Sequence, residues 1–150
     1  MGCGKTYLMN TVKGKAKIMD ATGIDNENVI NEVMSVVDDY DIVFISPDKE
    51  TRDLFNANGI DYDVFYPSAE RRGEFIENQV RKRTKPNDIR DLDRKFEKLV
   101  KEMDDDENSN CYKHKLLNQG EFIGNTPIIM QYIDSINSVQ NNKPNTQTNE

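Results

Sequence analysis

The stretch IVFIS (residues 42–46) is an apolar run that ends on a polar residue. Such a run is expected of a strand that is buried on both faces, as in a parallel sheet. Ser46 and Pro47 then match the N-cap and the first position of a helix, which we expect to run to about Asn58 and to stop at Gly59. The stretch therefore predicts a β-strand that leads directly into a helix.

The same alternation continues on both sides of this stretch. Before it, we predict a strand over residues 16–20 and a helix over residues 26–40, with Asp25 as a possible N-cap. After it, DVFYP (63–67) reads as a strand, and Ser68 precedes a basic helix over residues 69–83. Strands and helices that alternate with short connections form an α/β fold with a parallel sheet.

The C-terminal half has a more mixed pattern. Apolar residues at helical spacing predict a helix over residues 87–103, and residues 112–123 read as a final strand or a small hairpin. A last helix is expected over residues 126–137, with Thr126 as its cap and Pro127 at its first position. Residues 138–150 are polar, so we predict one domain over residues 1–137 and a disordered tail.

Composition excludes some classes of partner. The 150 residues carry a formal net charge of −7, which argues against a general binder of nucleic acid or membrane surfaces. The two cysteines, Cys3 and Cys111, lie far apart in the sequence, so a reduced, cytoplasmic setting is expected. No run of 18 apolar residues suggests a membrane span.

The pentapeptide GCGKT (residues 2–6) matches the end of the phosphate-binding loop pattern G-x-x-x-x-G-K-[ST]. In such a loop, backbone N–H groups point at a phosphate beside a helix N-terminus. Lys5 would reach the β- and γ-phosphates of a nucleotide, and the Thr6 hydroxyl would coordinate Mg²⁺. An amphipathic helix predicted over residues 5–13 follows at once, as the motif requires.

The beginning of this loop is missing from the sequence. Aligned with the motif, the first glycine lies two residues before Met1, and the strand that normally precedes it is absent. Without that strand, residues 42–46 would lose a neighbour, and each buried unpaired backbone group costs roughly 1–3 kcal/mol. We expect that an N-terminal segment precedes Met1 in the natural protein; the alternative is a genuine short form.

Two further features point to phosphate chemistry. Asp20 ends the strand 16–20 on the side where ligands bind in α/β sheets, so it could contact an acceptor or a water on Mg²⁺; it could equally be a turn residue. Basic residues cluster in the helix 70–85, where Arg72 and Arg83 lie near the apolar side. Arginines neutralise the charge of a transferred phosphoryl group, and we favour this role over a solvated basic face. His114 receives no role.

The chain resembles adenylate-kinase-like proteins, the nucleoside monophosphate kinase type of P-loop proteins, and is similar to versions from phages and large viruses. The resemblance rests on GCGKT (2–6), DIVFIS (41–46), NGIDYDVFYPS (58–68), the helix with trailing arginines and LLNQGEFI (116–123). It implies a three-layer parallel sheet with helices on both faces, with ATP and Mg²⁺ as cofactors and transfer of the γ-phosphoryl group to a nucleotide acceptor.

Carried over residue by residue, the resemblance assigns the following roles. Residues Gly2, Cys3, Gly4, Lys5 and Thr6 would hold the ATP phosphates, and the arginines of residues 72–83 would act as lid residues. With the reasoning from the residues above, Thr6 and Asp20 are the candidate metal residues, and Lys5, Arg72 and Arg83 are the candidate catalytic residues. The sequence departs from the family because the acid expected after the strand 42–46 is absent. The predicted function is a small nucleotide kinase acting on a nucleoside or deoxynucleoside monophosphate; the alternative is a non-catalytic P-loop binding or regulatory module.

Overall fold

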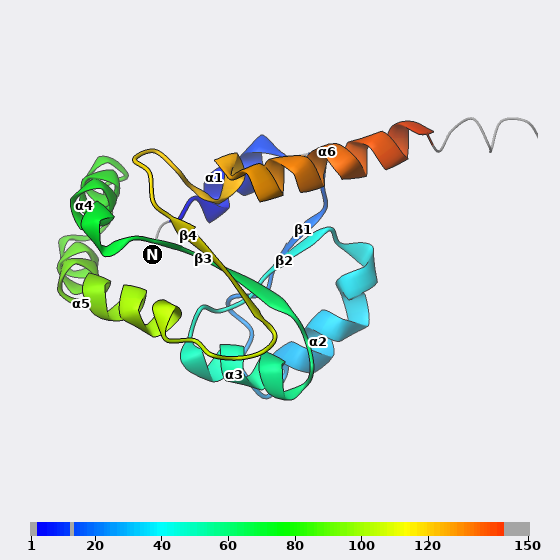
Figure 1. The fold of residues 1–150 in the computed structure, drawn as a ribbon, viewed down its shortest axis with the longest axis horizontal. Helices are drawn as coiled ribbons and strands as arrows, with labels where there is room; N and C mark the ends of the chain where they lie inside the picture. The colour runs from blue at the N-terminus through cyan, green and yellow to red at the C-terminus, as the bar shows by residue number, and fades with distance from the viewer. Residues whose placement is uncertain (1–2, 13, 143–150) are drawn as a thin grey trace, which may run out of the picture. The chain divides into compact units, whose positions relative to one another are not determined.

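A computed structural model describes residues 3–12 and 14–142 as two compact units (Figure 1). Unit 1 contains Cys3 and residues 46–121, and unit 2 contains residues 4–45 and 122–142. Each unit holds a two-stranded sheet whose strands are parallel, with helices around it. The predicted α/β class with parallel strands is therefore confirmed.

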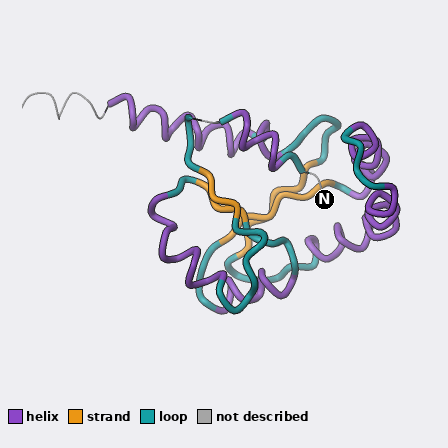
Figure 2. The backbone as a smooth tube through the Cα atoms, turned by 180° about the vertical axis from the view of Figure 1, so that it is seen from behind, coloured by secondary structure: helices purple, strands orange, loops and turns teal. Residues whose placement is uncertain are grey.

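Unit 2 is built on the sheet of β1 and β2. The strands β1 (Ile18–Asp20) and β2 (Ile42–Phe44) run side by side in the backbone view of Figure 2, with Ile18 opposite Ile42 and Asp20 opposite Phe44. The remaining elements are α1 (Lys5–Thr11), α2 (Val29–Val36), η1 (Val37–Asp39), η3 (Ile123–Asn125) and α6 (Pro127–Asn142). The buried apolar residues are Leu8, Val12, Ala21, Val29, Val33, Ile123 and Ile133.

The β2 strand uses only one of its two edges within the described residues. The Ile42 N–H donates to Lys17 O at 3.2 Å, and Phe44 O accepts from the Ala21 N–H at 2.8 Å. Residues along a strand alternate in the edge to which their backbone groups point. The N–H and C=O of Val43 therefore point away from β1, toward the open edge of this sheet.

Unit 1 is built on the sheet of β3 (Tyr62–Pro67) and β4 (Cys111–Leu116), which pair in parallel over six residues each. Its helices are α3 (Lys49–Ala57), η2 (Ala69–Arg71), α4 (Arg72–Arg81) and α5 (Pro86–Asp104). The rings of Phe75 on α4 and Phe96 on α5 lie 5.7 Å apart in the core. The other buried apolar residues include Phe55, Tyr62, Val64, Tyr66, Val100, Met103 and Leu116.

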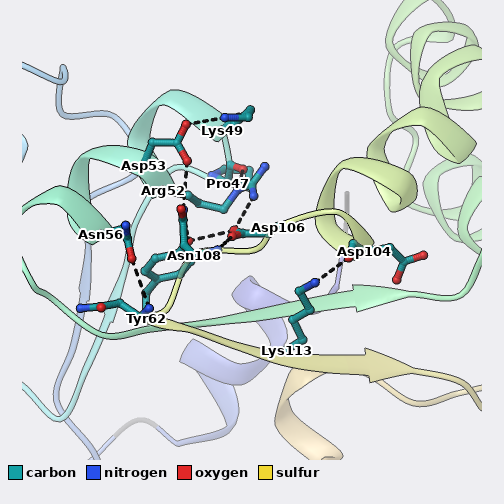
Figure 3. Close-up of polar contacts among 11 residues, drawn as sticks. Pro47, Lys49, Arg52, Asp53, Asn56, Tyr62, Asp104, Asp106, Asn108 and Lys113 are labelled. Carbon is teal, nitrogen blue, oxygen red and sulfur yellow. Dashed lines mark hydrogen bonds and ion pairs between the residues drawn. The ribbon is translucent and has the colours of Figure 1, made fainter.

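A buried polar network fixes α3 and the loop after α5 to this sheet (Figure 3). Arg52, only 2% exposed, donates to Pro47 O at 3.0 Å and to Asp106 Oδ2 at 2.6 Å. The hydroxyl of Tyr62 donates to the same carboxylate at 2.8 Å. The Asn108 side chain in turn donates to the Tyr62 hydroxyl at 2.9 Å. These hydrogen bonds connect the 105–110 loop to α3 and β3.

The structure corrects two predicted elements and decides between the two alternatives for a third. Ser46 is not the N-cap of α3, because the helix begins at Lys49 and its N-cap is Asp48, itself a favoured cap residue. The Ser46 hydroxyl instead donates to the Asp48 carboxylate at 2.9 Å. Of the final strand or small hairpin expected here, the structure shows the strand, Cys111–Leu116, and the long helix α5 provides the crossover that a parallel partner of β3 needs. The last helix extends to Asn142 rather than ending at 137.

Several expectations agree with the structure. The α3 helix stops where predicted, with Asn58 as its C-cap and Gly59 at φ 67°, a conformation that favours glycine. Pro127 is the first residue of α6, as expected. The last residues of the predicted disordered tail, 143–150, lie outside the described part of the chain.

Candidate functional site

The last three residues of the GCGKT segment, Gly4 to Thr6, form the start of α1. Gly4 is the N-cap of α1 at φ 92° and ψ 23°, and Lys5 is the first residue of the helix. A Cβ on Gly4 would lie 3.1 Å from the Phe122 Cβ, so both the left-handed backbone and the close approach require glycine here. Gly2 lies outside the described residues.

Lys5 and Asp20, predicted separately from the sequence, lie together in unit 2. The Lys5 Nζ is 3.0 Å from Asp20 Oδ2, and both side chains are about a third exposed. Asp20 reaches this position because it is the last residue of β1, where the carboxyl end of a parallel strand meets the helix start. The structure thus joins the two charges in one ion pair.

Thr22 completes this group and was missed in the sequence. Its hydroxyl donates to Asp20 Oδ1 at 2.6 Å, and its backbone N–H donates to the same oxygen at 3.1 Å. The Lys5 Nζ donates to the Thr22 hydroxyl oxygen at 3.3 Å. A hydroxyl residue two places after an acid at a strand end is the signal that could have indicated this turn.

These contacts favour the ionised form of Asp20. The hydrogen bond from Thr22 is the largest cause that holds the pKa of the Asp20 carboxyl below its usual value, with the Lys5 contact adding to it. Asp20 is therefore charged at neutral pH and accepts hydrogen bonds on both oxygens.

The two residues predicted as metal ligands carry donor types that suit the ion that the motif implies. Mg²⁺ prefers oxygen ligands and usually takes one or two from the protein, with waters and substrate phosphates completing its shell. Thr6, exposed in the first turn of α1, and Asp20 supply a hydroxyl and a carboxylate. The residues described in the structure contain no group of three or more His, Cys, Asp or Glu side chains that could hold a metal unaided.

Cys3 belongs to unit 1, whereas Gly4, Lys5 and Thr6 belong to unit 2. Burial raises the pKa of its thiol, against smaller opposing effects of the chain's amino group and Arg71. A raised pKa keeps the thiol protonated, so Cys3 is a poor nucleophile. Its predicted contact with phosphates would come from its backbone.

The two predicted catalytic arginines lie in unit 1 and differ in environment. Arg72 is half exposed, and its Nε lies 2.8 Å from Asp93 Oδ1 on α5, with Glu97 4.0 Å from its Nη1. Arg83 is exposed just after α4 with φ 58°, an uncommon value for a residue other than glycine, and has no ion pair among the described residues. Arg72 is thus engaged in a surface ion pair, whereas the guanidinium of Arg83 is available.

Arg71, one residue before α4, is the buried arginine of this segment. It is 5% exposed and forms two hydrogen bonds with the Glu74 carboxylate, at 2.9 and 2.8 Å. Its Nη1 donates to Leu116 O and Glu121 O, at 3.2 and 2.8 Å. These bonds make Arg71 a structural residue that fastens the end of β4 to α4.

The lone histidine has a partner on the neighbouring strand. The His114 ring lies 2.8 Å from Asp63 Oδ1 through Nε2 and stacks on Phe65, with ring centroids 4.5 Å apart. Both contacts join β4 to β3, and they give His114 a place in the sheet.

Comparisons with protein-family models, with curated proteins and with solved structures find no match for this chain. No helix among residues 3–12 and 14–142 is long and apolar enough to cross a membrane.

Proposed function

We propose that the protein transfers the γ-phosphoryl group of ATP to a nucleotide acceptor, a nucleoside or deoxynucleoside monophosphate. The observation that carries the proposal is the placement of Lys5 beside Asp20, at a helix start that requires glycine at position 4. An ammonium group and a carboxylate at the carboxyl end of a parallel strand suit a phosphate with its cation.

In this proposal ATP supplies the phosphoryl group and Mg²⁺ neutralises part of its charge. Lys5 binds the β- and γ-phosphates, while the first-turn N–H groups after Gly4 orient them. Thr6 and Asp20 hold the cation directly or through water. Arg72 and Arg83, which belong to the other unit, keep their proposed role of neutralising charge on a phosphoryl group, and Arg72 can take it only when it leaves Asp93.

The proposal extends to the sheet. The open edge of β2 at Val43 is where a further parallel strand would add, and the three-layer sheet implied by the resemblance needs such strands. We propose that β1 and β2 belong to a sheet of this kind.

The test compares ATP binding and phosphoryl transfer for the 150-residue chain and two lysine variants. Lys5→Ala should abolish transfer to a panel of nucleoside and deoxynucleoside monophosphates, with the circular dichroism spectrum unchanged. Lys15→Ala removes the same charge from an exposed residue near α1 and should retain activity. Transfer that survives Lys5→Ala, or no transfer to any acceptor by the unsubstituted chain, would refute the kinase proposal.

A non-catalytic binding module is the second candidate, and the ion pair of Arg72 favours it. An arginine already neutralised by Asp93 and Glu97 needs no phosphate to satisfy it. This candidate predicts that the chain binds nucleotide through Lys5 without turnover. ATP binding that is lost in Lys5→Ala, together with no transfer to any acceptor, would support it.

A further inference from the structure

The Lys5 ammonium already has an anionic partner in the protein itself. Asp20 Oδ2 lies 3.0 Å from Lys5 Nζ, and the Thr22 hydroxyl oxygen accepts a second bond from the same ammonium. The other carboxylate oxygen, Asp20 Oδ1, accepts from both the hydroxyl and the backbone N–H of Thr22. Thr22 therefore fixes the carboxylate in the orientation that meets Lys5.

This arrangement changes what Lys5 offers to an incoming anion. The pair of Lys5 and Asp20 is electrically neutral, whereas a lysine that binds phosphate alone presents a full positive charge. An anion that approaches Lys5 must displace the Asp20 carboxylate or lie beside it, and like charges at short range repel. Both side chains are about a third exposed, so the pair is open to exchange with solutes.

We propose that Asp20, oriented by Thr22, is an internal competitor that keeps free polyphosphate anions off Lys5. Asp20 gives up its contact with Lys5 when the ligand carries its own divalent cation. The cation then binds the Asp20 carboxylate, and the phosphate binds the Lys5 ammonium. Asp20 is then a specificity-determining residue and Thr22 a positioning residue. The inference rests on the proposed function, since it concerns phosphate binding at Lys5.

The first experiment measures binding of inorganic tripolyphosphate to the 150-residue chain by calorimetry, in EDTA and in Mg²⁺. Tripolyphosphate tests the phosphate contacts without any contribution from a base or ribose. For the unsubstituted chain, Mg²⁺ should strengthen binding at least tenfold. Asp20→Asn should strengthen binding in EDTA by about tenfold or more, and the ratio between the two conditions should approach one.

Three matched variants separate the competitor from other effects. Thr22→Ser keeps the hydroxyl and should behave as the unsubstituted chain, whereas Thr22→Val keeps the shape and should shift binding in EDTA toward the Asp20→Asn value. Asp25→Asn removes the same charge five residues further along, where the carboxylate contacts Asn28. This variant should change tripolyphosphate binding neither in EDTA nor in Mg²⁺.

A second measurement needs no ligand. The ammonium signal of Lys5 in a lysine-labelled NMR sample should show slowed exchange with water, and Asp20→Asn should remove that protection while leaving other lysine signals unchanged. A Lys5 signal with the same exchange rate in both proteins would overturn the inference.

The two proposals fail in different ways. If binding depends on Lys5 but Asp20→Asn does not change binding in EDTA, the competitor role of Asp20 is overturned and the phosphate site is retained. The same conclusion follows if Asp25→Asn strengthens binding in EDTA as much as Asp20→Asn does. Binding that is absent in every variant and condition, or is indifferent to Lys5→Ala, overturns the proposed function and the competitor with it.

Discussion

Arg52 carries its positive charge at a position that is only 2% exposed. A buried charge is tolerated when a partner of opposite charge and further hydrogen bonds compensate for the loss of water. The compensation comes from two hydrogen bonds. The Nη1 of Arg52 donates to Asp106 Oδ2, and its Nε donates to Pro47 O. The Nη2 atom is buried without a partner among the described atoms, so this side chain is not fully satisfied.

Removing one member of this pair should be costly. Asp106→Asn leaves the Arg52 charge buried and uncompensated, so we expect the free energy of unfolding to fall by about 3–5 kcal/mol in urea titrations. Arg52→Met together with Asp106→Asn should recover part of that loss because no buried charge is then left over. Equal losses in the single and double variants would contradict this account.

An exposed ion pair on the same helix is the control. The Lys49 ammonium lies 2.5 Å from Asp53 Oδ2 on α3, and its side chain is 72% exposed. Such surface pairs contribute about 0–1 kcal/mol, so Lys49→Met should have little effect on urea unfolding. The difference between the losses of unfolding free energy in Asp106→Asn and Lys49→Met measures how much burial increases the cost of breaking an ion pair.

At the scale of elements, most helices and strands could be predicted from the sequence. The 42–44 strand and the helix that stops before Gly59 follow from an apolar run and a glycine that takes a left-handed conformation. The strand 111–116 could not be assigned as parallel to β3, because its exposed Lys113 and Lys115 resemble a hairpin strand and only the α5 crossover decides its direction. Local periodicity does not encode strand partners.

The candidate site was predictable only in part, for a similar reason. Lys5 and Asp20 were found from a motif and from a position at a strand end, both of which are local in sequence. The roles of Thr22 and Arg71 depend on which groups the fold brings within hydrogen-bond distance. The basic helix gave no signal that Arg71 would be buried while its neighbour Arg72 would not.

The junction between β4 and α4 should depend on pH. Glu74 Oε2 accepts from the Gly120 N–H at 2.9 Å and from Arg71, and the Arg71 hydrogen bond is the largest cause that lowers the pKa of this carboxyl. A carboxyl with a lowered pKa in the folded state stabilises the fold above its unfolded pKa. That contribution is lost as the pH falls through the folded value.

We therefore expect the free energy of unfolding to fall between about pH 5 and pH 3 more steeply in the unsubstituted chain than in Glu74→Gln. Urea unfolding at a series of pH values measures this slope. Glu77→Gln, at an exposed position on the same helix, is the matched control and should keep the steep slope. Identical slopes in all three proteins would exclude Glu74 as a source of the acid sensitivity.

At the scale of the whole molecule, the chain is organised as two units that each contain one parallel pair of strands. Gly4, Lys5 and Thr6 of the GCGKT segment belong to unit 2 with Asp20 and Thr22, whereas Cys3, the arginine segment and the buried network belong to unit 1. The alternation of strands and helices along the chain predicted the α/β class. It did not predict this division, since contact between distant segments decides it.

The open edge of β2 has a consequence for the behaviour of the purified protein in solution. The apolar run Ile42–Ile45 has no charge and no proline, and the backbone groups of Val43 lack a partner strand within the described sheet. Such edges template pairing between chains and lead to fibrillar aggregates. We expect the 150-residue chain to form thioflavin-positive aggregates at high concentration.

Val43→Pro tests whether this edge is responsible. Proline removes an N–H that points away from β1, so the pairing of β2 with β1 should survive while the growth of fibrils slows. Unchanged fibril growth in a folded Val43→Pro protein would place the aggregating segment elsewhere. If growth does slow, the strand that helps to define the fold is also the segment that has to be covered for the protein to stay dispersed in a crowded cell.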